Sequence, residues 1–439
     1  MCEKEQRIFL VGIGMGTEEG VTVQAQKIIR SCDCLIGAER MLGCARRICE
    51  TPLSEEKIQR GRETERIQAG SAQRPMLSEY RPAEIACYIK EHPEHRSIAV
   101  LFSGDTGFYS GAKRLKEALQ ERFAECRIEL VPGISSVIFL AARLQTSWED
   151  GALVSLHGKD GDFIQTVDRN RKTFLLLGSA QSGEKVLGRL NEYGMEHVTV
   201  HAGSRLGYED ERIISGKPSE LTKEDLEGLC TVLIENPCPR RDAGPHVRDE
   251  DFIRGNVPMT KEEVRAVSVA RLQLTEDAVV WDVGAGTGSV SVEAARSGDQ
   301  VRVYAVEKNP QALELIRENR KRFRTDGIRI IRGEAPEVLA DLEAPTHVFV
   351  GGSSGNLREI LSCVLEKNKS ARIVINAISL ETVKETMEAV EEGLLKQPEI
   401  VQMSVSRSRE LGRYHMMTGM NPVYIISAGG ETADERGEA

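Results

Sequence analysis

The stretch Val279-Val280-Trp281-Asp282-Val283-Gly284-Ala285-Gly286-Thr287-Gly288-Ser289 decides the fold of the C-terminal half of this chain. An apolar run ends in an acid, and a glycine-rich turn follows at once. Apolar residues then recur at helical rather than strand spacing, at Val290, Val292, Ala294 and Ala295. The pattern predicts a buried strand, a tight loop and a helix. Because glycine permits positive φ and a helix N-terminus has free N–H groups, we expect this loop to approach a ligand closely.

The spacing of the glycines narrows the class of ligand. A dinucleotide-binding fingerprint reads G-x-G-x-x-G, and its third glycine packs the helix against the strand. Here the spacing is G-x-G-x-G, and Ser289 stands where the third glycine would be. This departure ranks a nicotinamide-dependent oxidoreductase low. The loop residues that we expect to contact a cofactor are Gly284, Ala285, Gly286, Thr287 and Gly288.

Three further strands are predicted in this half, over residues 301–306, 328–331 and 347–350. Glu307 ends the first of them, where an acid can accept both ribose hydroxyls of a nucleoside. The second runs into a loop with Gly333, Glu334 and Ala335, which we expect to flank an adenine. Open α/β sheets bind ligands at the carboxyl ends of their strands. These residues together predict a nucleoside pocket, suited to NAD or to S-adenosylmethionine (SAM).

Composition excludes some classes of protein. The 439 residues are 40% hydrophobic and 29% charged, which is ordinary for a globular protein of about two to four domains. No apolar run approaches the roughly 20 residues of a membrane span, and the charged N-terminus does not resemble a signal peptide. A net charge of −10 counts against a surface that coats nucleic acid. The ten cysteines form no C-x-x-C pair and no Cys/His cluster, so we expect no metal site, and reduced thiols in the cytoplasm.

The N-terminal half repeats the pattern of strand, loop and helix. A strand predicted over 8–11 is followed by Gly12-Ile13-Gly14-Met15-Gly16, and one over 97–102 runs into a turn of small residues. A third strand, over 128–131, ends in Pro132-Gly133-Ile134-Ser135-Ser136 at a helix start. Small residues at such positions make ligand-facing turns. We therefore expect a second ligand-facing edge in this half of the chain.

Composition also predicts the domain boundaries. Proline, glycine and charged residues crowd residues 238–254, which we interpret as a linker. The polar C-terminal tail is expected to be flexible. The predicted parts are an N-terminal α/β domain at 1–237 with subdomains at about 1–147 and 148–237, a C-terminal α/β domain at 255–430, and the tail at 431–439.

Six segments of the C-terminal half occur together: VPMTKEEVR at 257–265, DVGAGTGS at 282–289, VEKN at 306–309, GEAP at 333–336, FVGGS at 349–353 and NPV at 421–423. With them, residues 255–426 resemble the decarboxylating precorrin methyltransferase family of cobalamin biosynthesis. The resemblance implies a Rossmann-like SAM-dependent fold that methylates ring carbon 15 and removes the carboxyl group of the ring-C acetate. It also implies a SAM contact for Thr260, which with Glu263 equally fits a capping box at a helix start.

Four segments of the N-terminal half also form a set: VGIGMG at 11–16, SGDTGFY at 103–109, VPGISS at 131–136 and LGYEDE at 206–211. Residues 7–235 resemble the tetrapyrrole methylase family, and the last segment points to the branch that methylates carbon 5 of the precorrin ring. That family has proline where Met15 stands, although methionine fills a similar volume.

The second resemblance also implies a set of residues that border SAM in the N-terminal half. For Ser135 and Ser136, helix capping is the alternative role. The implied cofactor-binding residues are Met15, Ser103, Gly104, Asp105, Phe108, Ser135, Ser136, Leu177 and Gly178.

The expected substrate-side residues follow from the charge of a precorrin, which carries many carboxylates. Lys261 and Arg265 lie where the first helix of the C-terminal domain begins, and a guanidinium can bind a carboxylate through two hydrogen bonds. Ordinary surface charges are the alternative for both. His157, at a predicted strand end, and His415, in a predicted loop between the last strands, are further candidates to contact substrate or carry a proton.

With these resemblances, the sequence predicts a bifunctional SAM-dependent C-methyltransferase with one SAM in each domain and a tetrapyrrole substrate. SAM supplies the electrophile, so the protein needs to position the reactants rather than supply a nucleophile or a metal. A nucleic-acid methyltransferase with an accessory domain, and a non-catalytic SAM- or dinucleotide-binding sensor, are the alternatives. We expect neither nucleic acid nor a membrane as a partner, and exposed sheet edges favour a homo-oligomer.

Overall fold

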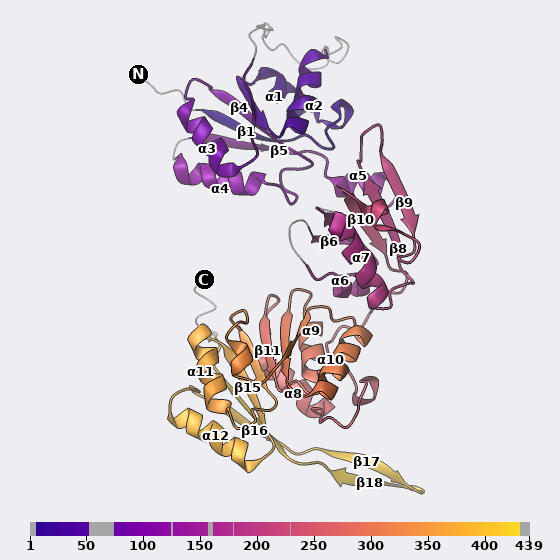
Figure 1. Ribbon diagram of the computed structural model, residues 1–439, viewed down its shortest axis with the longest axis vertical. Helices are drawn as coiled ribbons and strands as arrows, with labels where there is room; N and C mark the ends of the chain where they lie inside the picture. The colour runs from indigo at the N-terminus through magenta and orange to yellow at the C-terminus, as the bar shows by residue number, and fades with distance from the viewer. Residues whose placement is uncertain are drawn as a thin grey trace. The chain divides into compact units, whose positions relative to one another are not determined.

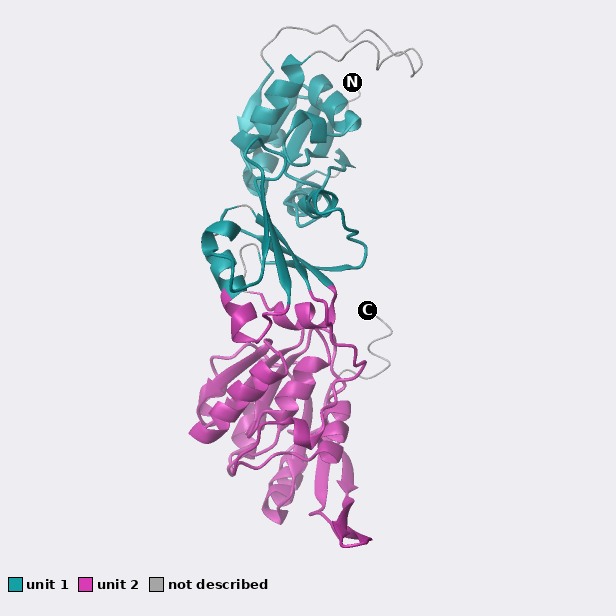
Figure 2. Cartoon of the chain, turned by 90° about the vertical axis from the view of Figure 1, so that its right-hand side faces the viewer, with its two compact units in different colours: residues 1–159, 172–187, 198–235 teal, residues 160–171, 188–197, 236–439 magenta. Residues whose placement is uncertain are grey.

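The computed structural model describes residues 6–51, 74–123, 126–156, 161–178, 180–228 and 230–430 (Figure 1). The chain divides into two compact units (Figure 2). Unit 1 contains residues 1–159, 172–187 and 198–235, and unit 2 contains residues 160–171, 188–197 and 236–439. His157 and the tail at 431–439 lie outside the described residues. Within the described part of the chain, no helix is long and apolar enough to cross a membrane.

Five parallel strands form the first sheet of unit 1, in the order β3-β2-β4-β1-β5. They are β1 (Arg7–Gly12), β2 (Cys34–Gly37), β3 (Met76–Ser78), β4 (Ser97–Phe102) and β5 (Arg127–Val131). The helices beside them are α1 (Val23–Ser31), α2 (Glu39–Glu50), α3 (Pro82–Glu91) and α4 (Ala112–Arg122). The first two pack on one face of the sheet and the last two on the other. Because both faces are covered, β1 and β4 are apolar along almost their whole length.

The second sheet of unit 1 is mixed and has the order β6-β7-β10-β8-β9. Its strands are β6 (Gly151–Ser155), β7 (Lys172–Leu177), β8 (Thr199–Ser204), β9 (Arg212–Gly216) and β10 (Cys230–Glu235). Only β6 and β7 run parallel. Helix α5 (Ser136–Arg143) packs Leu140 against Phe174 and Leu233 of this sheet. The helix that begins at the predicted serine loop is therefore anchored by the second sheet.

Unit 2 is built on a seven-stranded sheet with the order β13-β12-β11-β14-β15-β19-β16. Its strands are β11 (Val279–Val283), β12 (Arg302–Glu307), β13 (Ile328–Arg332), β14 (His347–Val350), β15 (Arg372–Ala377), β16 (Glu399–Met403) and β19 (Val423–Ala428). The first five strands of that order are parallel, and β19 and β16 are antiparallel to their neighbours. The predicted Rossmann-like α/β fold is confirmed.

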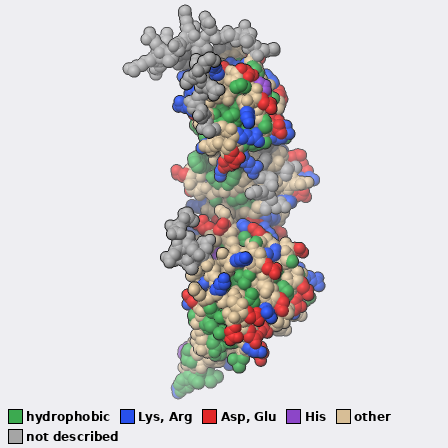
Figure 3. All heavy atoms as spheres, turned by 90° about the vertical axis from the view of Figure 1, so that its left-hand side faces the viewer, with side chains coloured by type: hydrophobic (Ala, Val, Ile, Leu, Met, Phe, Trp, Pro, Cys, Tyr) green, Lys and Arg blue, Asp and Glu red, His purple; other side chains and the backbone are tan. Residues whose placement is uncertain are grey.

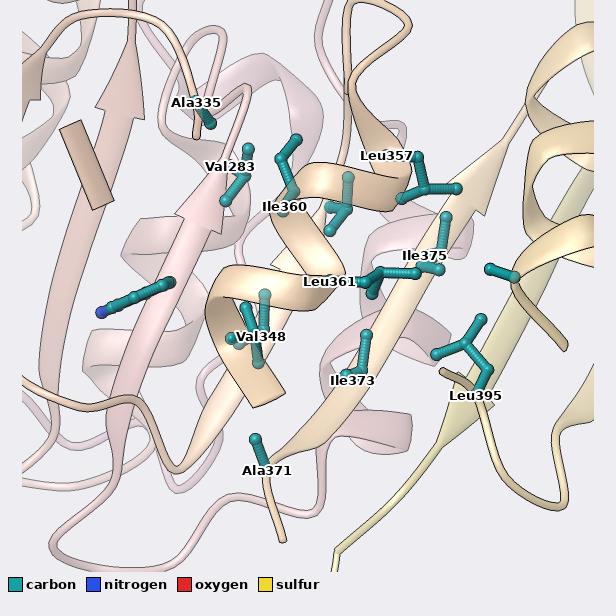
Figure 4. Close-up of a cluster of buried hydrophobic side chains, with 14 of the residues drawn as sticks. Val283, Ala335, Val348, Leu357, Ile360, Leu361, Ala371, Ile373, Ile375 and Leu395 are labelled. Carbon is teal, nitrogen blue, oxygen red and sulfur yellow. The ribbon is translucent and has the colours of Figure 1, made fainter. Parts of the chain in front are cut away.

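The helices of unit 2 cover both faces of this sheet. They are α8 (Glu262–Leu272), α9 (Ser289–Arg296), α10 (Pro310–Arg322), α11 (Leu357–Lys367) and α12 (Leu380–Glu391). Figure 4 shows one face, where Leu357, Ile360 and Leu361 of α11 pack over Val348 of β14 and over Ile373 and Ile375 of β15. Each fully buried side chain of this kind contributes about 1.5–3 kcal/mol to stability. The apolar faces therefore hold the strand ends, and the loops after them, in place.

Helix α6 (Ile164–Arg169) and the last residues of α7 (Ala180–Glu192) belong to unit 2. Asp326 is 2% exposed, and its carboxylate accepts hydrogen bonds from the backbone N–H groups of Phe163 and Ile164 at 2.9 Å each. The Gln165 N–H lies 3.2 Å from the same carboxylate, and Arg189 forms an ion pair with it. Asp326 therefore satisfies the free N–H groups at the start of α6.

Residues 238–254, interpreted from composition as a linker, include side chains that are buried in unit 2. Val247 is 7% exposed and Phe252 is 4% exposed, and both join the apolar cluster between the sheet and α9. Asp249 is 3% exposed and pairs with Arg265. Composition did not indicate this packing, because the segment is rich in proline, glycine and charged residues and only a few of its side chains are apolar and buried.

A hairpin extends from unit 2 and consists of β17 (Ser406–Leu411) and β18 (Tyr414–Gly419). Its apolar side chains are exposed, and they gather at its tip, the lower end of the view in Figure 3. These exposed residues are Leu411, Tyr414, Met416 and Met417. The loop predicted around His415 is therefore part of a hairpin strand. The apolar and polar residues of β17 and β18 alternate too weakly to indicate strands in the sequence alone.

Candidate active site

A cavity of about 520 Å³ lies at the carboxyl edge of the parallel strands of unit 2. The loops after β11, β12, β13 and β14 all contribute to its wall. The segments that line it include residues 257–261, 283–286, 306–309, 333–335 and 351–354. The strand ends that were predicted to form a nucleoside pocket therefore line a single cavity.

The glycine loop is held in a conformation that other residues cannot adopt without strain. Gly284 has a φ of +73°, and a Cβ atom there would lie 2.7 Å from the Gly352 carbonyl oxygen. Gly286 has a φ of +57°, and its Cβ would lie 2.9 Å from the Pro258 carbonyl oxygen. The loop thus passes between two backbone segments, and the N–H groups of Gly284 and Ala285 donate to the Val306 carbonyl oxygen, at 3.0 and 3.1 Å.

The last two residues predicted for this loop do not line the cavity. Thr287 is 1% exposed, and its carbonyl accepts a hydrogen bond from the Asn319 side chain at 3.0 Å. Gly288 precedes α9 in a left-handed conformation against Ile316. Of the five predicted loop residues, Gly284, Ala285 and Gly286 face the cavity.

Glu307 organises the cavity wall at the end of β12. Its carboxylate accepts the backbone N–H of Gly286 on one oxygen, at 2.9 Å. The other oxygen accepts the N–H groups of Lys308 and Asn309, also at 2.9 Å each. A carboxylate has about four acceptor positions, so one remains for a ribose hydroxyl in this conformation. The Lys308 ammonium pairs with Glu334 at 2.6 Å, which closes the adjoining wall.

Arg265 requires a correction, because it does not face the cavity. Its side chain is fully buried, with Nε 2.6 Å from Glu293 and Nη1 3.0 Å from Asp249. The same guanidinium donates to the carbonyl oxygens of Thr260 and Val247 and stacks on Phe252. With these partners it is not available to a substrate carboxylate. It instead holds the Thr260 carbonyl and so fixes the wall at residues 257–261.

Thr260 and Lys261 both line the cavity. The predicted capping box, formed by Thr260 and Glu263, is wrong. Helix α8 begins at Glu262, its N-cap is Lys261, and it has no side-chain cap. Glu263 pairs with Arg407 of β17 instead, at 2.6 Å. The T-x-x-E motif therefore forms no capping box, and the Glu263 carboxylate pairs with a charge on the hairpin, which is distant in the sequence.

His415 also requires a correction. It lies on β18 with its side chain 69% exposed, 3.6 Å from Glu410, and it is not part of the cavity wall. Sequence reasoning did not assign six further lining residues to the site, although Asn421 and Val423 lie in one of the segments that it singled out. The six residues are Asn376, Ile378, Val405, Met420, Asn421 and Val423. The available signal was the apolar run Ile373-Val374-Ile375, which is typical of a buried strand and ends at Asn376.

In unit 1, three glycines meet at the carboxyl edge of β1, β4 and β5. A Cβ atom at Gly133 would lie 2.2 Å from the Gly104 carbonyl oxygen, and one at Gly12 would lie 2.7 Å from the same atom. Asp105 joins the loops, because its two oxygens accept the N–H groups of Gly107 at 2.8 Å and of Gly133 at 3.0 Å. The Asp105 carboxylate is therefore used to hold the predicted site together.

The remaining predicted residues of unit 1 have mixed surroundings. Ser135 is the N-cap of α5 and accepts the Ile138 N–H at 3.3 Å, so the capping role is present. Ser103 accepts a hydrogen bond from Arg40 at 3.0 Å, and Arg40 also donates to the Tyr208 hydroxyl at 3.0 Å. Sequence reasoning missed Arg40. A single charged residue on a predicted helix is too common in protein sequences to indicate a site residue.

Met15 and the other predicted site residues near the second sheet of unit 1 are mostly buried. Met15 is 8% exposed and belongs to the cluster that contains Leu140 and Phe174. Leu177, at the end of β7, is 3% exposed, and Phe108 packs at the edge of the same cluster. Ser136, the first residue of α5, and Gly178, which follows β7, lie beside these residues in the chain. Among the described residues, no group of His, Cys, Asp or Glu could hold a metal ion.

A Rossmann-like sheet with a glycine loop after β11 and an acid at the end of β12 is typical of α/β proteins that bind a nucleotide at the carboxyl ends of their strands. Residues 251–428 match the family model described as precorrin methyltransferase domain, and residues 7–222 match the model for tetrapyrrole (corrin/porphyrin) methylases. The chain belongs to the precorrin methyltransferase family and carries a tetrapyrrole methylase domain before it.

Each of three similar proteins matches less than half of this chain. A probable cobalt-precorrin-6B C(15)-methyltransferase (decarboxylating) from Pyrobaculum calidifontis is 44% identical over 189 residues, which are 42% of this chain and 96% of the relative. The cobalt-precorrin-6B C(15)-methyltransferase (decarboxylating) of Salmonella typhimurium is 38% identical over 41% of this chain and 94% of the relative. The crystal structure of precorrin-6y C5,15-methyltransferase from Geobacter metallireducens is 39% identical over 42% of this chain and 96% of that chain, with a TM-score of 0.40.

Proposed function

We propose that this chain is a bifunctional SAM-dependent methyltransferase of cobalamin biosynthesis. Its C-terminal domain methylates carbon 15 of a precorrin or cobalt-precorrin and removes the carboxyl group of the ring-C acetate. Its N-terminal domain methylates carbon 5. The observation that carries the proposal is the 44% identity to a probable decarboxylating C(15)-methyltransferase across 96% of that relative, together with the precorrin methyltransferase family match at residues 251–428, which build the cavity.

The residues of the cavity suit a nucleoside cofactor at one end. Glu307 has one free acceptor position for a ribose hydroxyl, and the loop at 333–335 lies beside it. Gly284 and Gly286 keep the loop close to the backbone of Gly352 and Pro258, because a Cβ atom at either would clash with it. The amino-acid portion of the cofactor would lie along this loop. SAM, when bound, supplies an activated methyl group on sulfur. The protein then holds the ring carbon in line with that methyl at a near-attack distance of about 3–3.5 Å.

The other end of the cavity suits part of a macrocycle with acidic side chains. It is largely apolar, through Val264, Ile378, Val405, Met420 and Val423. Lys261 supplies a positive charge at its rim. Loss of the acetate carboxyl converts –CH2–CO2⁻ and a proton from water into –CH3 and CO2. The electron pair of the broken C–C bond passes through the methylene carbon to the conjugated ring before protonation.

The proposal for the N-terminal domain rests on its family match and on the loops that meet at Gly12, Gly104 and Gly133. A second SAM at this edge would give each domain its own cofactor. Two methylations of one tetrapyrrole on one chain benefit from tethering, which raises the effective concentration of one site near the product of the other.

A single-turnover mass analysis tests the function. Purified full-length protein is mixed with excess SAM and either metal-free or cobalt-containing precorrin-6B. We expect a gain of two methyl groups and the loss of one CO2 with one of the two substrates. A gain of one methyl with CO2 loss would leave only the C-terminal assignment standing. No mass change despite measured SAM binding would overturn the proposal and favour a sensor.

A further inference from the structure

Asn376 is a buried polar residue on the side of the cavity opposite the proposed nucleoside position. It lies near the end of β15, is 8% exposed and lines the cavity. The strand order puts β12, with Glu307, on one side of β11, and β14 and then β15 on the other side. Asn376 therefore faces the region where a substrate, rather than the nucleoside, would lie.

Among the described residues, the Asn376 side-chain oxygen has a hydrogen-bond partner and the side-chain nitrogen has none. Its oxygen lies 3.0 Å from the hydroxyl of Ser268, a fully buried residue of α8. Its nitrogen is buried and has no hydrogen-bond acceptor among the residues that the structure describes. A buried donor without a partner is unfavourable, so such a group in a native cavity calls for an acceptor that arrives with a ligand.

The orientation of the amide follows from the single proton of the Ser268 hydroxyl. That hydroxyl is near two acceptors, the Asn376 oxygen at 3.0 Å and the Val264 carbonyl at 2.8 Å. The Val264 carbonyl already accepts the helical N–H of residue 268, as any i−4 carbonyl does in an α-helix. The Asn376 oxygen has no other donor, so the Ser268 hydroxyl donates to it. With its oxygen toward Ser268, the amide has its nitrogen directed away from α8.

The surroundings favour a carboxylate as the missing acceptor. Val264, Ile378 and Val423 line the same cavity as Asn376, so a carboxylate that enters it loses part of its hydration. A neutral amide orients that carboxylate without stabilising its charge as strongly as a guanidinium would. Decarboxylation disperses the negative charge into the ring, so a desolvated carboxylate held by a neutral donor gains relative stabilisation in the transition state.

We propose that the Asn376 side-chain nitrogen binds and orients the substrate carboxylate that leaves as CO2. The inference rests on the proposed function of the C-terminal domain. In the step, the bond between the carboxyl carbon and the methylene carbon breaks, and its electron pair passes into the macrocycle. Water then supplies the proton that completes the methyl group. Asn376 exchanges no proton and forms no covalent bond.

The test compares Asn376→Asp and Asn376→Leu with the wild type in the full-length chain, with precorrin-6B and excess SAM. CO2 loss and methyl gain are counted separately by mass, and SAM affinity is measured by calorimetry. Asn376→Asp places a negative charge where the carboxylate binds, and we expect CO2 loss to slow at least 10-fold. Asn376→Leu removes the unpartnered donor, so we expect a similar loss of rate with an unchanged or higher Tm. SAM affinity should stay within about twofold for both.

The outcomes separate this inference from the proposed function. Asn191→Asp, the same change at an exposed residue of α7, is the matched control and should behave as wild type. If wild type releases CO2 and Asn376→Asp releases it within twofold of that rate, the inference is wrong while the function stands. If Asn376→Leu lowers the Tm by several degrees, Asn376 is structural. If the wild type itself releases no CO2, the proposed function fails and takes this inference with it.

Discussion

The carboxyl group of Asp282, near the end of β11, is 1% exposed, and burial raises its pKa to about 7. The Ser291 hydroxyl donates to one of its oxygens, while the other has no partner among the described residues. This acid does not line the cavity. Its position ahead of the glycine loop was visible in the sequence, but its burial was not, because burial depends on the packing of α9 against the sheet.

Asp282 makes unit 2 less stable as the pH rises. Below about pH 4 the group is protonated in both the folded and the unfolded states. Between pH 4 and 7 only the unfolded state ionises, so stability falls by about 1.4 kcal/mol per pH unit. Asp282→Asn should lack this component. Urea unfolding at pH 5 and pH 8 in a Trp148→Phe background, where Trp281 reports on unit 2, measures it. An equal pH dependence in both proteins would contradict the assignment.

Arg265 is the second residue whose role depends on burial. Two buried carboxylates, from Glu293 and Asp249, meet at its guanidinium. We expect Arg265→Met to lower the free energy of unfolding by about 3–5 kcal/mol, because both charges lose their partner. Arg265→Lys keeps the charge but cannot also hold the Thr260 carbonyl, so SAM should bind about 10-fold more weakly. Chemical unfolding and calorimetry test the two effects. Retained SAM affinity in the lysine variant would refute a role in positioning the wall.

At the scale of elements, the capped helix α6 shows how one side chain can fix a segment far away in the sequence. Asp326 follows α10 in the chain, and it accepts the N–H groups at the start of α6. The helix has only six residues, which is too short to be stable alone. Its place in unit 2 therefore depends on this carboxylate and on the apolar contacts of Phe163 and Ile164.

Replacing Asp326 by alanine should lower the stability of unit 2 by about 2–4 kcal/mol, because three N–H groups and Arg189 lose their acceptor. Hydrogen exchange at residues 163–165 should speed up by more than the global loss of stability explains. Asp299→Ala, which removes a half-exposed partner of Arg169, is the milder control. If exchange at 163–165 were unchanged, the capping role would be refuted.

At the scale of the whole molecule, the two candidate sites are built on separate units, and each depends on glycines that are in tight contact with backbone. Gly133→Ala should disable the N-terminal site and Gly286→Ala the C-terminal site, each by displacing its loop. We expect the first variant to keep CO2 loss and one methyl transfer, and the second to lose both CO2 release and one methyl transfer. Mass analysis of the products distinguishes them.

Two helical glycines provide the controls for these loop variants. No atom lies within 4 Å of a Cβ at Gly43 in α2 or at Gly188 in α7. Gly43→Ala and Gly188→Ala should retain full activity and gain about 0.5–1 kcal/mol of stability, because alanine loses less entropy in a helix. If Gly286→Ala abolished both methylations, the two sites would not be independent.

The sequence by itself determined the α/β class, the positions in the chain of the strands that carry the site, and the glycine loops. Strands predicted at 97–102 and 347–350 coincide with β4 and β14, because continuous apolar runs ending in small residues depend on local spacing alone. Glu307 and the loop at 333–335 were predicted for the same reason, since their place follows from strand ends.

Only the tertiary structure decided which polar side chains face the cavity. Arg265 and Lys261 are four residues apart on one helix start, yet one is buried on Glu293 and the other lines the cavity. His415 lies on an exposed hairpin, whereas Asn376, a residue with no motif, is buried at the site. Side-chain direction is set by partners that are distant in the chain, and one sequence does not display those contacts.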